Sequence, residues 1–150
     1  MSGNKKPRKP GRSRVRSFTT PGALPIIFRN DTESERVLKL MPHTELAELR
    51  EGRGTEQGYW CVTNRLNYTS TLASMVEFSF DPAPVINAGL DAMVALDKRH
   101  KEVGKYVFRA EELKAVGEAL TLADDMDDAT TRRQHRDALA KLFKTFPEAA

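Results

Sequence analysis

Residues 84–103 read PVINAGLDAMVALDKRHKEV, and this stretch decides the fold class that the sequence predicts. Its apolar side chains recur every three or four positions, as they do along the buried face of an α-helix. Pro84 suits the first turn of a helix, and the glycine after Val103 suits a helix end. The spacing therefore predicts an amphipathic helix over residues 84–103. The apolar positions on its buried face are Ile86, Leu90, Met93, Leu96 and Val103.

The same periodicity occurs on both sides of this segment. On the N-terminal side it predicts a short helix over residues 43–51 and a longer helix over residues 56–77. On the C-terminal side a helical pattern starts near Leu113 and runs to about residue 144, with an irregularity near residues 127–130. Amphipathic segments joined by short connections favour an all-α fold, a small antiparallel helical bundle.

Two stretches leave an alternative open. Residues 24–41 contain short apolar runs, and residues 76–80 alternate apolar and polar side chains with the period of a strand. An α+β fold with a small sheet built from these two stretches is the alternative to the bundle.

The net charge of +3 is divided very unevenly along the chain. Residues 1–16 carry seven cations and no carboxylate, while the rest of the chain holds 17 basic and 21 acidic side chains, a net charge of −4. Charge repulsion and interspersed prolines disfavour a folded structure in the first segment. We therefore expect residues 1–25 to form a disordered basic arm and residues 26–150 to form a single domain. The seven cations are Lys5, Lys6, Arg8, Lys9, Arg12, Arg14 and Arg16.

Nucleic acid is the partner that this arm predicts. Flexible Lys and Arg side chains neutralise phosphates and release condensed counterions, which gives affinity for DNA or RNA without reading the sequence. Arg53, between two glycines and just before the expected start of a helix, is a further candidate for anion contact. A tail that only keeps the protein soluble is the alternative role for the arm.

The remaining chemistry-bearing residues predict no cofactor and no metal site. Cys61 is the only cysteine, so no internal disulfide can form, and its apolar surroundings predict a buried, unreactive thiol. His43, His100 and His135 lie in no metal-binding spacing and are expected at the surface or at helix caps. No apolar run approaches the ~20 residues that span a bilayer. We expect a cytoplasmic protein that is not an enzyme and does not contact a membrane.

An acidic cluster precedes a basic one in the last expected helix. On a continuous helix Asp124 and Asp128 share one face, and Arg132 follows one turn later. This pattern predicts a solvated, ion-paired helix face rather than a Mg²⁺ site. The two clusters comprise Asp124, Asp125, Asp127 and Asp128, followed by Arg132, Arg133 and Arg136.

A protein partner is the second kind of binding that the sequence suggests. Tyr59 and Trp60, aromatic residues of types favoured at interfaces, and the acidic pair Asp124 and Asp128 are the candidates for contact with a host protein or with a second copy in a homodimer.

Part of the chain also resembles a group of known sequences. The stretch LAELREGRGTEQGYWCVTNRLN, the later ELKAVGEALTLADDM and the basic start are similar to small uncharacterised proteins of prophages and mobile elements in proteobacteria. The resemblance implies no catalytic residue and covers about half of the chain. It implies a non-catalytic accessory protein that binds nucleic acid, or alternatively an inhibitor or adaptor that binds a host or defence protein. The residues that carry it are Leu49, Gly52, Arg53, Thr55, Trp60 and Asn64.

Overall fold

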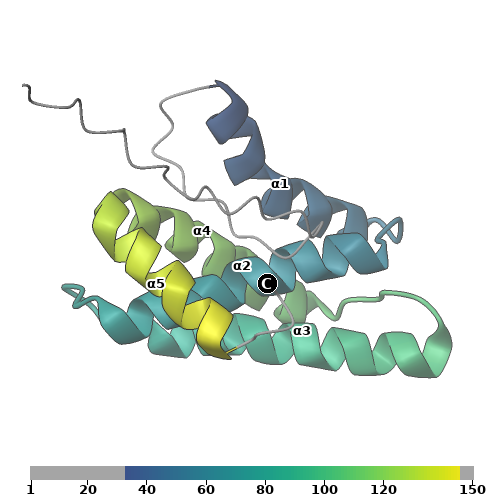
Figure 1. Cartoon of the computed structure of the whole chain (residues 1–150). Helices are drawn as coiled ribbons and strands as arrows, with labels where there is room; N and C mark the ends of the chain where they lie inside the picture. Colours follow the sequence, from purple (N-terminus) through teal and green to yellow (C-terminus); the bar gives the residue numbers. More distant parts are fainter. Residues whose placement is uncertain (1–32, 146–150) are drawn as a thin grey trace, which may run out of the picture.

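The computed structural model describes residues 33–145, and this part of the chain is a bundle of five α-helices without a strand (Figure 1). The predicted all-α fold is confirmed. The α+β alternative is wrong for residues 33–41, which are helical, and for residues 76–80, which form an irregular connection. Residues 1–32, and with them the expected arm, lie outside the described residues. The helices are α1 (Glu33–Arg50), α2 (Glu56–Met75), α3 (Ala83–Val103), α4 (Ala110–Asp128) and α5 (Arg132–Thr145).

The first helix begins earlier than its sequence indicates. A start at residue 43 was expected because proline suits the first turn of a helix, but α1 begins at Glu33 and contains Pro42 in its interior. A proline removes one backbone hydrogen bond, and the packing of α1 against both α2 and α4 compensates for that loss.

The expected C-terminal helix is in fact two helices, because α4 ends at Asp128 and α5 begins at Arg132. A capping box opens α5. The backbone N–H of Gln134 donates to Thr131 Oγ1 at 3.2 Å, and the backbone N–H of Thr131 donates to Gln134 Oε1 at 2.9 Å. This reciprocal pair satisfies two amides that a continuous helix would use internally, so the chain turns here.

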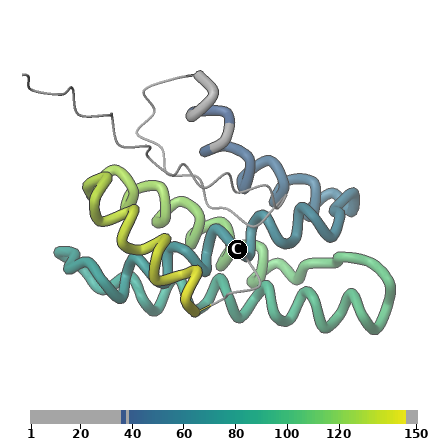
Figure 2. Tube along the Cα trace, viewed as in Figure 1, coloured from purple at the N-terminus to yellow at the C-terminus, as the bar shows by residue number. Residues whose placement is uncertain are grey.

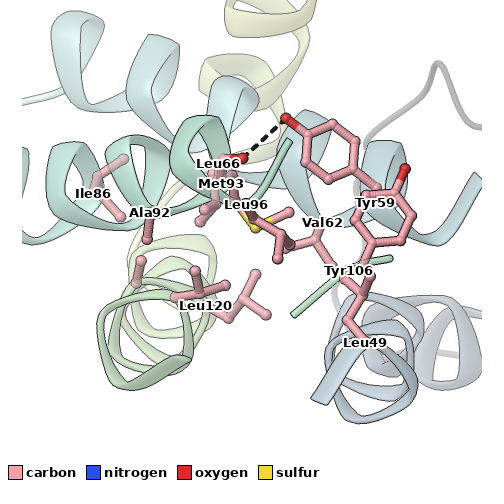
Figure 3. Close-up of a cluster of buried hydrophobic side chains, with 12 residues drawn as sticks. Leu49, Tyr59, Val62, Leu66, Ile86, Ala92, Met93, Leu96, Tyr106 and Leu120 are labelled. Carbon is pink, nitrogen blue, oxygen red and sulfur yellow. Dashed lines mark hydrogen bonds between the residues drawn. The ribbon is translucent and has the colours of Figure 1, made fainter. Parts of the chain in front are cut away.

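The core forms around α2, which packs against each of the other four helices. Within the main cluster, Tyr59 donates a hydrogen bond from its hydroxyl to the Met93 carbonyl oxygen at 3.2 Å (Figure 3). The expected buried face of α3 is confirmed except at its end, where Val103 is 58% exposed because it lies in the last turn. The large buried members of the main cluster are Leu49, Tyr59, Val62, Leu66, Ile86, Met93, Leu96, Tyr106, Val116 and Leu120.

A second, smaller cluster attaches α5 to the bundle. Tyr68 and Leu72 of α2 pack there against Ala138 and Leu142 of α5. Among the described helices α5 packs mainly against α2, and its His135 Nε2 also lies 3.4 Å from the Asp127 carbonyl oxygen of α4. Figure 2 shows the trace of α5 along the outside of the bundle, at the end away from the α3–α4 connection. The side of α5 opposite its buried residues His135, Ala138 and Leu142 is exposed.

Candidate functional site

Of the residues proposed for nucleic-acid contact, only Arg53 lies within the described part of the chain, since Lys5 to Arg16 fall outside it. Arg53 follows Gly52, whose φ of +77° turns the chain between α1 and α2. Its guanidinium donates to both carboxylate oxygens of Glu48, from Nε at 2.9 Å and from Nη2 at 3.0 Å. These hydrogen bonds, and then the charge of Glu48, raise the pKa of Arg53. Arg53 is thus exposed but already paired with a carboxylate.

A buried ion pair between α2 and α4 is the most unusual polar feature of the bundle. Arg65 Nη2 lies 2.5 Å from Asp127 Oδ2 and 3.1 Å from Asp124 Oδ1. The side chains of Arg65 and Asp127 are only 8% and 7% exposed, so their charges depend on each other rather than on water. Burial opposes the charge of Arg65, but the two carboxylates outweigh it and raise the pKa of the guanidinium.

The first helix extends this network. His43 Nε2 lies 2.7 Å from Asp124 Oδ2, and Lys39 Nζ lies 3.1 Å from Asp128 Oδ1. Burial alone would raise the pKa of Asp124. The hydrogen bond from His43 and the charge and hydrogen bond of Arg65 outweigh burial and hold that pKa below its ordinary value. The cations on these aspartates therefore come from α1 and α2.

The expectation of a solvated, ion-paired face on one continuous helix is wrong for Asp127, which is buried. Asp124 is partly buried, and Asp128 keeps a 64% exposed side chain. The reason lies in the turn at residues 129–131, which puts the acidic and the basic clusters on different helices. The acidic cluster holds α1, α2 and α4 together.

A second buried polar cluster joins α2 to the start of α5. A hydrogen bond links the Tyr68 hydroxyl to His135 Nδ1, and His135 Nε2 lies 2.8 Å from Thr130 Oγ1. The prediction that His135 is a surface or capping residue is wrong, because its ring lies in the interface between these helices. Burial raises the pKa of Tyr68, which keeps its hydroxyl protonated and able to hydrogen-bond. This cluster fixes the direction in which α5 leaves the turn.

The two aromatic candidates for partner contact differ in accessibility. Tyr59 is a core residue stacked on Tyr106, with ring centroids 5.6 Å apart, so its ring is not available at the surface. Trp60 meets Tyr59 edge-on at 5.2 Å and keeps 46% of its surface exposed. Cys61 is half-buried rather than buried, and burial raises the pKa of its thiol.

Sequence reasoning did not find Arg65, Tyr68 or His135 as a polar layer inside the bundle. One signal was present, because Arg65 adjoins Leu66 and lies within the apolar stripe of its helix, where a cation needs a buried acidic partner. Among residues 33–145 no group of three or more His, Cys, Asp or Glu side chains is placed to hold a metal ion. None of the described helices is long and apolar enough to cross a membrane.

Comparison of the chain with protein-family models, with curated proteins and with solved structures gives no match. Function therefore has to be inferred from charge, burial and geometry.

Proposed function

We propose that the protein is a non-catalytic accessory factor that binds nucleic acid through its basic N-terminal arm. One observation carries the proposal. Residues 1–16 hold seven cations and no carboxylate, whereas the rest of the chain has a net charge of −4. A generally basic protein would not concentrate its charge in this way. A short, dense run of Lys and Arg is suited to releasing counterions from a phosphate backbone.

The described domain provides a firm attachment for such an arm. Lys39 pairs with Asp128 and His43 hydrogen-bonds to Asp124, so two contacts hold α1 against α4. Asp128 is paired with Lys39 and Asp124 with Arg65, which reduces the repulsion that these carboxylates would exert on a phosphate backbone.

An origin in a phage or mobile element and a cytoplasmic location belong to the proposal as well. The proposed origin rests on the resemblance of the stretches around Trp60 and Asp124 to small proteins of prophages and mobile elements. Two copies joined in a homodimer would double the number of arms per complex, which raises affinity through effective concentration.

Deletion of residues 1–16 tests the proposal. Binding of a labelled duplex DNA and of a labelled single-stranded RNA is followed by fluorescence anisotropy at low salt, with full-length protein and with the deletion. We expect the deletion to lose most of its affinity for at least one of the two probes while keeping the helical circular dichroism spectrum and the thermal midpoint of the parent. Equal affinity of the two proteins for both probes would refute the proposed function.

A protein-binding inhibitor or adaptor is the second candidate, and the surface of α1 favours it. Val37, Leu40 and Met41 lie at positions i, i+3 and i+4 of this helix, and all three are exposed. An apolar stripe of this kind is suited to contact with another protein.

A pull-down from a nuclease-treated bacterial lysate separates this function from the first. If the protein is an inhibitor or adaptor, its partner remains bound after nuclease treatment, and Leu40→Glu abolishes that binding. Val94→Glu, a control at an exposed valine of α3, should leave the binding unchanged. A partner that disappears with the nuclease would instead support nucleic-acid binding.

A further inference from the structure

The last helix differs in charge from the rest of the described chain. Residues 132–145 carry five cations and one carboxylate, a net charge of +4. Residues 33–131 carry eleven cations and eighteen carboxylates, a net charge of −7. A basic helix thus lies on an acidic bundle, and this division is separate from that between the arm and the domain.

The cations of α5 are concentrated on the side that faces away from the bundle. His135, Ala138 and Leu142 are its buried residues. At about 100° per residue, the opposite side carries Arg133, Arg136 and Lys144 together with Asp137 and Ala140. All five of these positions are exposed. We call Arg133, Arg136, Asp137, Ala140 and Lys144 the outer face of α5.

The three cations of the outer face have no partner among the described residues. Their side chains make no ion pair or hydrogen bond within residues 33–145. By contrast, Arg53, Arg65, Arg99 and Lys101 elsewhere in the bundle are each paired with a carboxylate. With one carboxylate, that of Asp137, beside these three cations, the outer face has a net charge of +2, which a ligand of opposite charge would stabilise.

We propose that the outer face of α5 binds the phosphate backbone of double-helical DNA. Arg133 and Lys144 are eleven residues apart, which is about 16 Å along a helix with a rise of 1.5 Å per residue. The major groove of B-form DNA is about 12 Å wide and admits an α-helix. Cations at the two ends of α5 can therefore reach phosphates on both strands. The small side chain of Ala140 allows the middle of the helix to approach closely.

The geometry favours DNA over double-stranded RNA. The major groove of an A-form helix is too narrow and deep for side chains to read, so a flat, cation-bearing helix face fits B-form DNA better. The outer face carries no evident set of base-reading side chains. We therefore expect binding that depends on salt and on duplex form but little on base sequence.

The outer face of α5 is separate from the basic arm. The Lys39–Asp128 ion pair holds α1 against the end of α4, and α5 begins four residues after Asp128. The inference goes beyond the arm-based function, because the outer face belongs to the folded domain and is expected to bind DNA without the arm.

The test compares two triple variants of the full chain that remove the same charge. The first is Arg133→Gln/Arg136→Gln/Lys144→Gln. The control is Lys98→Gln/Lys105→Gln/Lys114→Gln, which changes exposed cations around the α3–α4 connection. The affinity for a duplex of about twenty base pairs is measured by fluorescence anisotropy over a range of salt concentrations. Circular dichroism checks that both variants keep the helical fold.

Each phosphate contact contributes about 0.9 to the slope of log affinity against log salt concentration. Loss of three contacts should therefore reduce the steepness of that slope by about 2.7. We expect this reduction for the α5 variant and a much smaller one for the control. Equal reductions in the two variants would show an effect of net charge alone and would overturn the inference, as would an unchanged slope in the α5 variant. The same affinities are measured with a duplex RNA. If the parent binds duplex DNA and duplex RNA equally well, and the α5 variant weakens both equally, the choice of DNA as the ligand is overturned.

A third protein, in which the seven arm cations are replaced by Gln, keeps the two proposals separable. If this protein binds DNA like the parent while the α5 variant does not, the arm-based function fails and the inference about α5 stands. If the arm variant loses binding and the α5 variant does not, the inference fails and the arm-based function stands.

Discussion

Arg65→Met removes the cation of the buried ion pair between α2 and α4 and leaves Asp127 without its partner. Methionine keeps much of the length of the side chain, so little space opens in the core. The carboxylate of Asp127 is only 7% exposed and loses a contact of 2.5 Å. It then has either to stay charged in an apolar surrounding or to take up a proton.

Breaking a buried pair by removing one partner destabilises proteins by about 3–5 kcal/mol. A folded region of about a hundred residues has a free energy of unfolding of roughly 5–15 kcal/mol, so this one substitution removes a large fraction of it. For a domain of that size each kcal/mol lowers the thermal midpoint by about 4 °C or more, which gives a decrease of at least about 12 °C. The loss should be smaller in Arg65→Met/Asp127→Leu, because neither charge remains buried.

The assay is urea unfolding followed by circular dichroism at the helix band, with the parent, Arg65→Met, the double variant and Arg53→Met. Arg53→Met is the control, since it breaks an exposed arginine–glutamate pair and should leave the midpoint unchanged. A loss of less than about 1 kcal/mol in Arg65→Met would contradict the reasoning, because that is the range expected of a solvated pair. A double variant as unstable as Arg65→Met would show that the loss does not come from the unpaired carboxylate.

Three further substitutions test the packing of the helices and the ion-pair network between α1, α2 and α4. Gly117→Ala should raise the free energy of unfolding by about 0.5–1 kcal/mol, since alanine favours a helix and nothing lies within 4 Å of the new Cβ. Gly89→Ala should lower the free energy of unfolding, because the new Cβ would lie 2.6 Å from the Ala119 Cβ and force α3 and α4 apart. Urea unfolding measures the effect of each glycine substitution. Shifts of the same sign in Gly117→Ala and Gly89→Ala would contradict the packing described. The pKa of Asp124 is lower in the folded than in the unfolded protein, so its stabilising effect is complete above its ordinary value of about 4 and is lost as the pH falls. The difference in unfolding free energy between parent and Asp124→Asn should therefore shrink as the pH falls from about 5 through the lowered pKa of Asp124, and a difference independent of pH would disprove this.

The helices could be predicted from the sequence where their apolar periodicity is continuous. Residues 84–103 showed this best, because the buried positions from Ile86 to Leu96 follow one face without interruption. The early start of α1 could not be predicted, since Pro42 is locally a helix-start signal and only packing against α2 and α4 overrides it. The sequence carries a local signal for the break before α5, the Thr-x-x-Gln pattern of a capping box that starts at Thr131. The helical periodicity on both sides of it favoured a continuous helix instead.

The polar interior was harder to predict than the fold. The pairs Arg65–Asp127 and Tyr68–His135 each join residues more than sixty positions apart. Nothing local in the sequence indicates which aspartate a buried arginine will meet. The outer face of α5 was missed for a related reason. Arg133 and Arg136 follow the acidic cluster closely in sequence, so they were expected to pair with it on one helix, whereas the turn at residues 129–131 separates the two clusters.

The salt dependence of DNA binding by a full-length protein whose seven arm cations are replaced by Gln tests the central claim most directly. The length of the chain and the described domain are unchanged in this variant, so only the charge of residues 1–16 differs from the parent. Because each phosphate contact contributes about 0.9 to the slope of log affinity against log salt concentration, we predict that loss of the seven arm cations makes this slope shallower by about 6. Parent and variant with the same slope and the same affinity would contradict the account.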